Sequence, residues 1–229
     1  MAANKILEEF RVFTNFAQDG FKYNLQVLPD TLTASAFLFA LLFQSPSLGA
    51  LSGTLLLLNF IHPVFANFLS NFVSGTLGAG DYARCSGHFP GVSMERIVGL
   101  GAARGFGALD SVWPSYYSMF LGTLAGYIGL LPFLYQKELD ASPKRKAASV
   151  LGLVVLGIVL ILGAAYRIIS GCDNAFGVFV GMLAGAIIGV GFAGFLAWIS
   201  ERNLTNVLGM PLLRSKTADG KPIYVCERK

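Results

Sequence analysis

The spacing of the charged residues is the feature that most constrains this chain. Long runs contain no Asp, Glu, Lys or Arg: Thr31 to Gly80, Ser111 to Gln136, Ala147 to Tyr166 and Asn174 to Ser200. A helix needs roughly 20 apolar residues to cross a bilayer. The first run has a polar break near Pro46 and is long enough for two spans joined by a hairpin. We therefore expect five spans, near residues 31–45, 50–73, 114–136, 147–168 and 174–200.

Composition supports a membrane protein. Charged residues make up 13% of the chain, about half the share in soluble domains, and the mean hydropathy is +0.61. A soluble bundle would show a polar stripe every three to four residues on its outer helices, and the last three runs show none. The fold class we predict is all-α, a polytopic transmembrane helical bundle.

Three parts are expected along the chain. Residues 1–30 have no compact apolar core typical of a signal peptide. They fit an amphipathic helix on the membrane interface, or a sixth span if that helix inserts. Residues 31–200 form the transmembrane domain, in which a glycine-rich loop over 74–113 is long enough to be functional and holds a short helix near Ser93 to Ala103. Residues 201–229 form a basic tail. The predicted apolar face of the first helix contains Ile6, Phe10, Phe13 and Phe16 or Phe21.

Basic residues are unevenly divided between the two faces of this bundle. Ten lie on one face, Lys137, Lys144, Arg145, Lys146, Arg202, Arg214, Lys216, Lys221, Arg228 and Lys229, and seven on the other, Lys5, Arg11, Lys22, Arg84, Arg96, Arg104 and Arg167. Positive loops tend to stay in the cytoplasm, so we predict a cytoplasmic C-terminus. The net charge of +4 lies in short flanking segments, which does not indicate nucleic-acid binding.

Two spans carry small residues at four-residue spacing. Such a ladder gives a helix a flat face that a neighbouring backbone can approach closely. We expect these glycines to mark helix contacts within the bundle, or alternatively a dimer seam. They are Gly122 and Gly126 in the third span and Gly177, Gly181, Gly185 and Gly189 in the last.

Two motifs open alternate spans. Pro114-Ser115-Tyr116-Tyr117-Ser118 begins one, and Tyr166-Arg167 followed by Asp173 and Gly177 begins the last. Over roughly Phe60 to Trp198 this pattern resembles the type 2 phosphatidic acid phosphatase family, helical bundles whose three motifs lie on one membrane face. The resemblance implies phosphate-contacting roles for Ser115 and Arg167.

The same resemblance places the family's catalytic histidines on Tyr117 and Asp173 and its supporting aspartate on Gly177. The reaction needs an imidazole nucleophile, an acid and cations that hold the phosphate. We therefore expect a degenerate core that no longer catalyses and that has a structural or lipid-head-group-binding role. Its expected partners are membrane lipids, including anionic head groups. The head-group set is Arg84, Arg104, Arg167, Ser115 and Tyr117; alternatively, Arg167 forms a local ion pair with Asp173.

The tail, from Asn203-Leu204-Thr205 through Pro211 to Cys226, resembles uncharacterised multi-pass proteins of giant nucleocytoplasmic DNA viruses. This resemblance implies a virion inner-membrane or viral-factory protein, with a second copy or other membrane or capsid proteins as partners. The Asn203-Leu204-Thr205 sequon lies on the predicted inner side, so we expect it to be unmodified.

Two other functions remain open. An active lipid or isoprenoid phosphatase would use His88, Arg167 and Ser115, because His88 is the only extramembrane imidazole. A transporter or channel would use the polar face of the second span, which contains Asn59, His62, Asn67 and Asn71.

Cysteine and histidine are too sparse and scattered for a metal site, and no cofactor is expected. Cys85 and Cys172 fall on the same predicted face, so a disulfide between them is allowed by topology. The alternative is three unpaired thiols.

Overall fold

The structure is a computed structural model of the 229-residue chain. It describes residues 19–20, 22–70, 113–200, 203–207, 213–216 and 222–224. The predicted apolar face of the N-terminal helix and nearly all of the predicted loop over 74–113 lie outside these residues. So do the side chains that were assigned to that loop, namely Arg84, Cys85, His88, Arg96 and Arg104.

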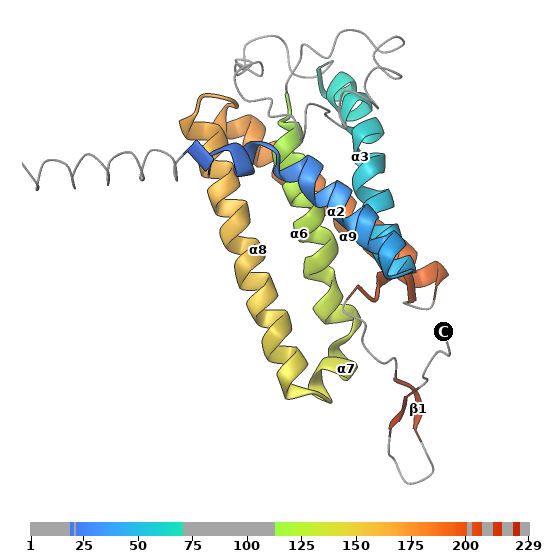
Figure 1. The fold of residues 1–229 in the computed structure, drawn as a ribbon. Coiled ribbons are helices and arrows are strands. Elements are labelled where there is room, and N and C mark those ends of the chain that lie inside the picture. Colours follow the sequence, from blue (N-terminus) through green and yellow to red (C-terminus); the bar gives the residue numbers. More distant parts are fainter. Residues whose placement is uncertain are drawn as a thin grey trace, which may run out of the picture.

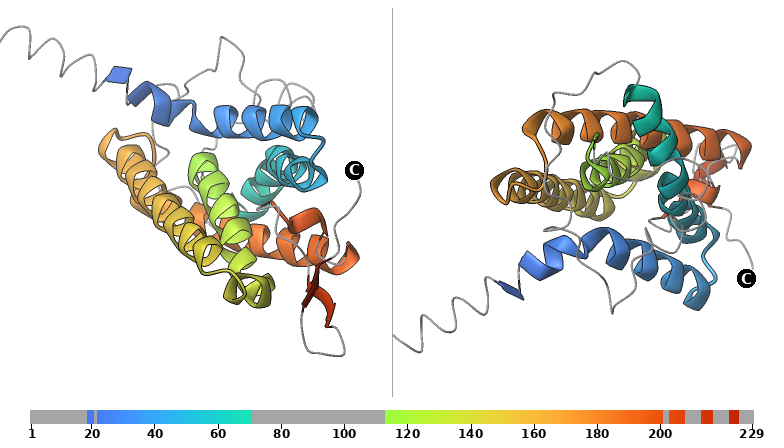
Figure 2. Two further views of the ribbon diagram at one scale, coloured as in Figure 1. Left: turned by 60° about the horizontal axis from the view of Figure 1, so that its bottom comes forward. Right: turned by 90° about the horizontal axis from the view of Figure 1, so that it is seen from above.

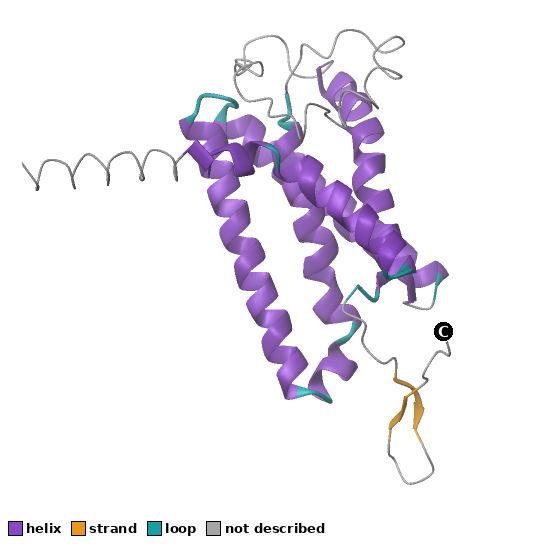
Figure 3. Ribbon diagram, viewed as in Figure 1, coloured by secondary structure: helices purple, strands orange, loops and turns teal. Residues whose placement is uncertain are grey.

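The described chain is a bundle of helices (Figures 1 and 3), which confirms the predicted fold class. Its helices are α2 (Leu28–Leu42), α3 (Pro46–Ser70), α6 (Tyr116–Leu134), α7 (Gln136–Asp140), α8 (Pro143–Ile169) and α9 (Ala175–Ile199), followed by the 3-10 turn η1 (Asn203–Thr205). Four of them, α3, α6, α8 and α9, are long and apolar enough to cross a membrane.

The first predicted span, near residues 31–45, corresponds to the short helix α2. Helix α2 has 15 residues, which is about 22 Å of rise, whereas the hydrocarbon core of a bilayer is about 30 Å thick. The bundle therefore has four full-length candidate spans and one short apolar helix beside them.

The tail departs locally from the all-α expectation. Strands β1 (Leu213–Lys216) and β2 (Pro222–Tyr224) pair antiparallel as a hairpin, with Leu213 opposite Tyr224.

The two ends of the bundle are defined by contacts between segments far apart in sequence. At the end we call the Ser115 end, Ser115 N–H donates to the Gly177 carbonyl (3.3 Å), so α6 and α9 start together and run parallel. At the opposite end, the Lys144 end, the Tyr135 hydroxyl bonds Thr205 Oγ1 (2.8 Å) and Ser47 Oγ donates to the Asn206 carbonyl (3.1 Å).

Local sequence explains where the helices start and stop. Ser115 caps α6 by accepting from Ser118 N–H, and Asn174 caps α9 by accepting from Phe176 N–H, as these residue types commonly do. Pro143 occupies the first turn of α8, where its missing N–H costs nothing. Gly171 follows α8 with φ +69°, a backbone conformation that glycine adopts without strain.

Helix α6 occupies the centre of the bundle, with α3, α8 and α9 around it (Figure 2). About 61% of the residues in its most apolar stretch are buried, against 6% of those in the corresponding stretch of α8. The outward side of α8 is uniformly apolar and more than half exposed at Val150, Leu151, Val154, Val155, Ile158 and Ile161. An exposed apolar face of this extent suits contact with lipid tails.

The closest helix contact joins α6 to α9 through small residues. All four glycines of the α9 ladder are buried, and Ala193 and Ala197 continue the four-residue spacing beyond them. A Cβ at Gly181, Gly185 or Gly189 would lie within 3.0 Å of α6 backbone atoms, and a Cβ at Gly122 or Gly126 would meet the α9 backbone at Met182 or Ala186. The ladders therefore lie in an intramolecular helix contact.

This contact predicts a sharp difference between two glycines of one helix. Gly185→Ala puts a methyl group against the Met119 carbonyl and Thr123 N–H, whereas a Cβ at Gly191 meets nothing within 4 Å. Because backbone cannot move aside as a flexible side chain can, we expect Gly185→Ala to destabilise the protein by about 1–3 kcal/mol. Thermal unfolding of the detergent-purified protein measures this.

Gly191→Ala is the matched control and should leave the unfolding midpoint unchanged or slightly raised. Equal effects of the two substitutions would contradict the close α6–α9 contact.

Candidate functional site

A buried polar cluster lies at the Ser115 end, where α3, α6, α8 and the α8–α9 turn meet. At its centre, Asp173 Oδ2 accepts two hydrogen bonds, from Arg167 Nε–H (2.5 Å) and from Ser115 Oγ–H (2.6 Å). Arg167 is 3% exposed, Asp173 7% and Ser115 fully buried. A single carboxylate oxygen thus joins α8, the turn before α9 and the cap of α6.

The α8–α9 turn has the conformation that brings Asp173 back to Arg167. The Cys172 and Asp173 N–H groups both donate to the Arg167 carbonyl (3.0 and 3.3 Å), and Gly171 supplies the positive φ. The ion pair is therefore local in sequence and is set by the shape of the turn.

Cys172 is buried in this turn and is disulfide-bonded. Cys85 and Cys226, the other cysteines of the chain, both lie outside the described residues. The pairing of Cys85 with Cys172 therefore stays a prediction.

Arg167 also contacts an aromatic ring. Its guanidinium carbon is 5.3 Å from the centroid of the Tyr117 ring, within the range of a cation–π interaction. That ring packs against α8 where Gly163 leaves room, since a Cβ there would lie 3.1 Å from Tyr117 Cε1. The Tyr117 hydroxyl is buried without a hydrogen-bond partner among the described residues.

Helix α3 joins the cluster through His62. Its Nε2 lies 2.8 Å from the Pro114 carbonyl, and because a carbonyl only accepts, Nε2 carries the proton. The ring meets Tyr116 edge-on at 5.2 Å, and the Tyr116 hydroxyl donates to Asn59 Oδ1 (2.7 Å). The backbone segment before α6 is thus held from both sides, by His62 and by Asp173.

The structure brings together Ser115, Tyr117, Arg167 and Asp173, the four motif residues that the sequence singled out. Of the two alternatives for Arg167, it shows the ion pair with Asp173. The other predicted members of the site, Arg84, Arg104 and His88, lie outside the described residues.

Two contributors to the cluster were missed at the sequence level. Asn59 and His62 were assigned to the polar face of a span, yet in the structure both contact the start of α6. Nothing local in the sequence indicates that His62 pairs with a carbonyl 52 residues later. Of the remaining polar positions on that face, the Asn67 side chain and all of Asn71 lie outside the description.

In chemical terms, the buried cation and one hydroxyl of the cluster are bound to an internal anion. Arg167 and Ser115, the groups best suited to hold a phosphate, both bind Asp173. Within the described part of the chain, no group of three His, Cys, Asp or Glu could hold a metal ion.

No protein-family model, curated protein or solved structure matches this chain.

The buried ion pair predicts a large effect of removing its acid. Asp173→Ala removes the carboxylate that pairs with the buried Arg167 charge, and removing one member of a buried ion pair typically costs about 3–5 kcal/mol. We expect a correspondingly large drop in the thermal unfolding midpoint of the purified protein.

The matched control is Asp140→Ala, which breaks the Lys146–Asp140 pair at the surface, where the side chains are 60% and 52% exposed. Such a pair contributes about 1 kcal/mol at most. In the double variant Arg167→Met/Asp173→Leu, which removes both charges, much of the loss should be recovered. Similar effects of Asp173→Ala and Asp140→Ala would show that the buried pair does not stabilise the bundle.

Proposed function

We propose that this chain is a non-catalytic, multi-pass integral membrane protein with a structural role, built on a degenerate lipid-phosphatase-like core. One observation carries the proposal: the Arg167 guanidinium and the Ser115 hydroxyl are both bound to the buried Asp173 carboxylate. The groups that would hold a substrate phosphate instead hold the helices together.

The chemistry of the cluster supports an inactive core. Phosphoryl transfer needs a nucleophile and unoccupied cationic donors around the phosphate. Asp173, at the position of the family's nucleophile, carries negative charge that repels phosphate. The Tyr117 hydroxyl, at the position of the family's acid, is buried against α8.

The placement of the motifs supports the likeness to a phosphatase core. The helices that they open, α6 and α9, run parallel and start beside one another, so both motifs face the same end of the bundle. That arrangement is the one the resemblance implies.

The contacts of Asn59 and His62 favour a structural role over a transport path. Both side chains bond across the α3–α6 interface, which makes them part of helix packing. A conducting path would need polar groups of this kind to face an open channel.

The surroundings we propose are lipid along α8 and anionic head groups at the Lys144 end, where Lys137, Lys144 and Arg145 are exposed. We place this end in the cytoplasm, where anionic lipids attract basic residues. The disulfide-bonded Cys172 near the opposite end fits an oxidising compartment there. From the resemblance of the tail, we further propose that the membrane is that of a virion or a viral factory.

An enzymatic assay tests the proposal directly. The protein, reconstituted in mixed micelles, is incubated with phosphatidic acid or an isoprenyl diphosphate, and released phosphate is measured. We expect the wild-type protein to release no more phosphate than the Arg167→Ala variant. Turnover by the wild type that Arg167→Ala abolishes would establish the rival function, an active phosphatase.

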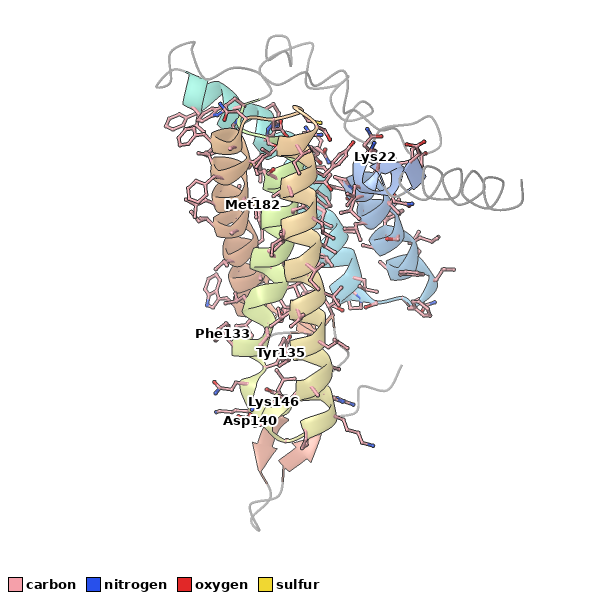
Figure 4. All side chains as sticks on the ribbon, turned by 90° about the vertical axis from the view of Figure 1, so that its left-hand side faces the viewer. Lys22, Phe133, Tyr135, Asp140, Lys146 and Met182 are labelled. Carbon is pink, nitrogen blue, oxygen red and sulfur yellow. The ribbon has the colours of Figure 1, made fainter. Side chains whose placement is uncertain are left out.

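Orientation has its own test. Lys22 and Lys146, both labelled in Figure 4, lie at opposite ends of the bundle. Lys144 belongs to the start of α8, two residues before Lys146. In sealed microsomes, an impermeant maleimide should label Lys144→Cys at once and Lys22→Cys only after detergent is added, each relative to the parent chain. The reverse pattern would place the C-terminus in the lumen.

A further inference from the structure

The turn between α8 and α9 is short and is shaped by its own hydrogen bonds. Only residues 170–174 separate these two helices, which have 27 and 25 residues. Within the turn, the N–H groups of Cys172 and Asp173 both donate to the Arg167 carbonyl (3.0 and 3.3 Å). The direction in which α9 leaves α8 is therefore set by the backbone of a few residues.

Two adjacent residues of this turn carry further constraints. Cys172 is fully buried and disulfide-bonded. Its neighbour Asp173 accepts hydrogen bonds from Arg167 Nε–H and from Ser115 Oγ–H on one carboxylate oxygen. A covalent bond and a buried ion pair thus act side by side on the same turn, and the ion pair also holds the start of α6.

The disulfide and the ion pair stabilise each other because both need the same conformation of the turn. A disulfide removes open conformations of the segment that it joins. A buried ion pair offsets the cost of taking its charges out of water only while its geometry is kept. Without the disulfide, the turn gains open conformations in which the Asp173 carboxylate does not reach Arg167. The ion pair is then formed in a smaller fraction of the molecules.

We propose that the disulfide of Cys172 is a redox switch for the Arg167–Asp173 pair. In the oxidised protein the pair holds the start of α6 against the α8–α9 turn, and reduction weakens that contact. A dithiol supplies the two electrons and two protons: the S–S bond breaks, two thiols form, and the dithiol becomes a disulfide. The Ser115 end is thus fully assembled only in oxidising surroundings. The inference does not depend on the non-catalytic role.

The redox equilibrium of Cys172 tests this coupling. If the disulfide stabilises the ion pair, the ion pair stabilises the disulfide by the same free energy. The purified protein in detergent is equilibrated with mixtures of reduced and oxidised dithiothreitol, and differential alkylation with mass spectrometry gives the fraction of Cys172 that is reduced. In Asp173→Ala, the ratio of reduced to oxidised dithiothreitol at half reduction should fall about 5-fold or more below the wild-type ratio.

Two controls separate the switch from a general loss of stability. Asp140→Ala removes an exposed carboxylate at the Lys144 end. Gly185→Ala disturbs the α6–α9 contact at Met119 and Thr123, away from the turn. Both variants should keep the wild-type dithiothreitol ratio. An unchanged ratio in Asp173→Ala, or an equal fall in either control, would overturn the proposal.

Thermal unfolding gives a second, independent measurement. Reduction should lower the unfolding midpoint of the wild type by about 5 °C or more. It should lower the midpoint of Asp173→Ala by less, because the ion pair that the disulfide supports is already absent. Cys172→Ser should unfold like the reduced wild type and should not respond to dithiothreitol. Equal shifts in the wild type and Asp173→Ala would contradict the coupling.

If Asp173→Ala does not fold, Ser115→Ala takes its place. This variant removes one of the two hydrogen bonds to the Asp173 carboxylate and keeps the ion pair, so the dithiothreitol ratio should fall by a smaller factor. An unchanged ratio in Ser115→Ala would then overturn the proposal. The outcome is separable from the enzymatic test: turnover by the wild type would refute the non-catalytic role, whereas an unchanged ratio would refute only the switch.

Discussion

The buried pair of Arg167 with Asp173 is the interaction on which the Ser115 end of the bundle depends. Removing two charges from water is costly, and the attraction between them offsets that cost only when the remaining hydrogen bonds are also made. Here Ser115 supplies one of those bonds and so ties α6 to the α8–α9 turn. Through the Pro114 carbonyl and His62, the same segment is tied to α3. One carboxylate thus sets the relative positions of helices that are distant in sequence.

Away from the Ser115 end, close packing contributes more than charge to holding the helices together. Lipid tails are as apolar as leucine, so helices in a membrane gain little from burying apolar side chains against each other. Close packing of backbones is the remaining route, and the glycines of α9 allow it from Ser115 to Tyr127. Thr123 shows how polar side chains fit such a contact, since its hydroxyl bonds the Met119 carbonyl within its own helix. Charge pairing therefore dominates at the Ser115 end, and close backbone packing dominates in the interior of the bundle.

The sequence alone predicted those features of the fold that depend on a local pattern of residues. The uncharged runs predicted the long helices, and the four-residue spacing of Gly177 to Gly189 singled out residues that lie in the α6–α9 contact. The motif residues Ser115, Arg167 and Asp173 were found through the resemblance of two motifs, and in the structure Arg167 lies in the last turn of α8. The role of His62 was not predictable, because its partner is a backbone carbonyl that any residue at position 114 would offer. The tail hairpin of β1 and β2 was not predicted, since the tail was identified only by its basic residues.

The distance between the charges that flank helix α8 indicates which bilayer thickness the protein fits. Its flanking charges, Lys146 and Arg167, are 21 residues apart, or about 31 Å along the axis, which matches a hydrocarbon core of about 30 Å. The two flanking charges differ in their surroundings. Lys146 is exposed and must stay among the head groups, whereas Arg167 carries its own counter-ion and can enter the hydrocarbon at lower cost. In a thicker membrane the protein should therefore sink at the Ser115 end while the Lys144 end stays anchored.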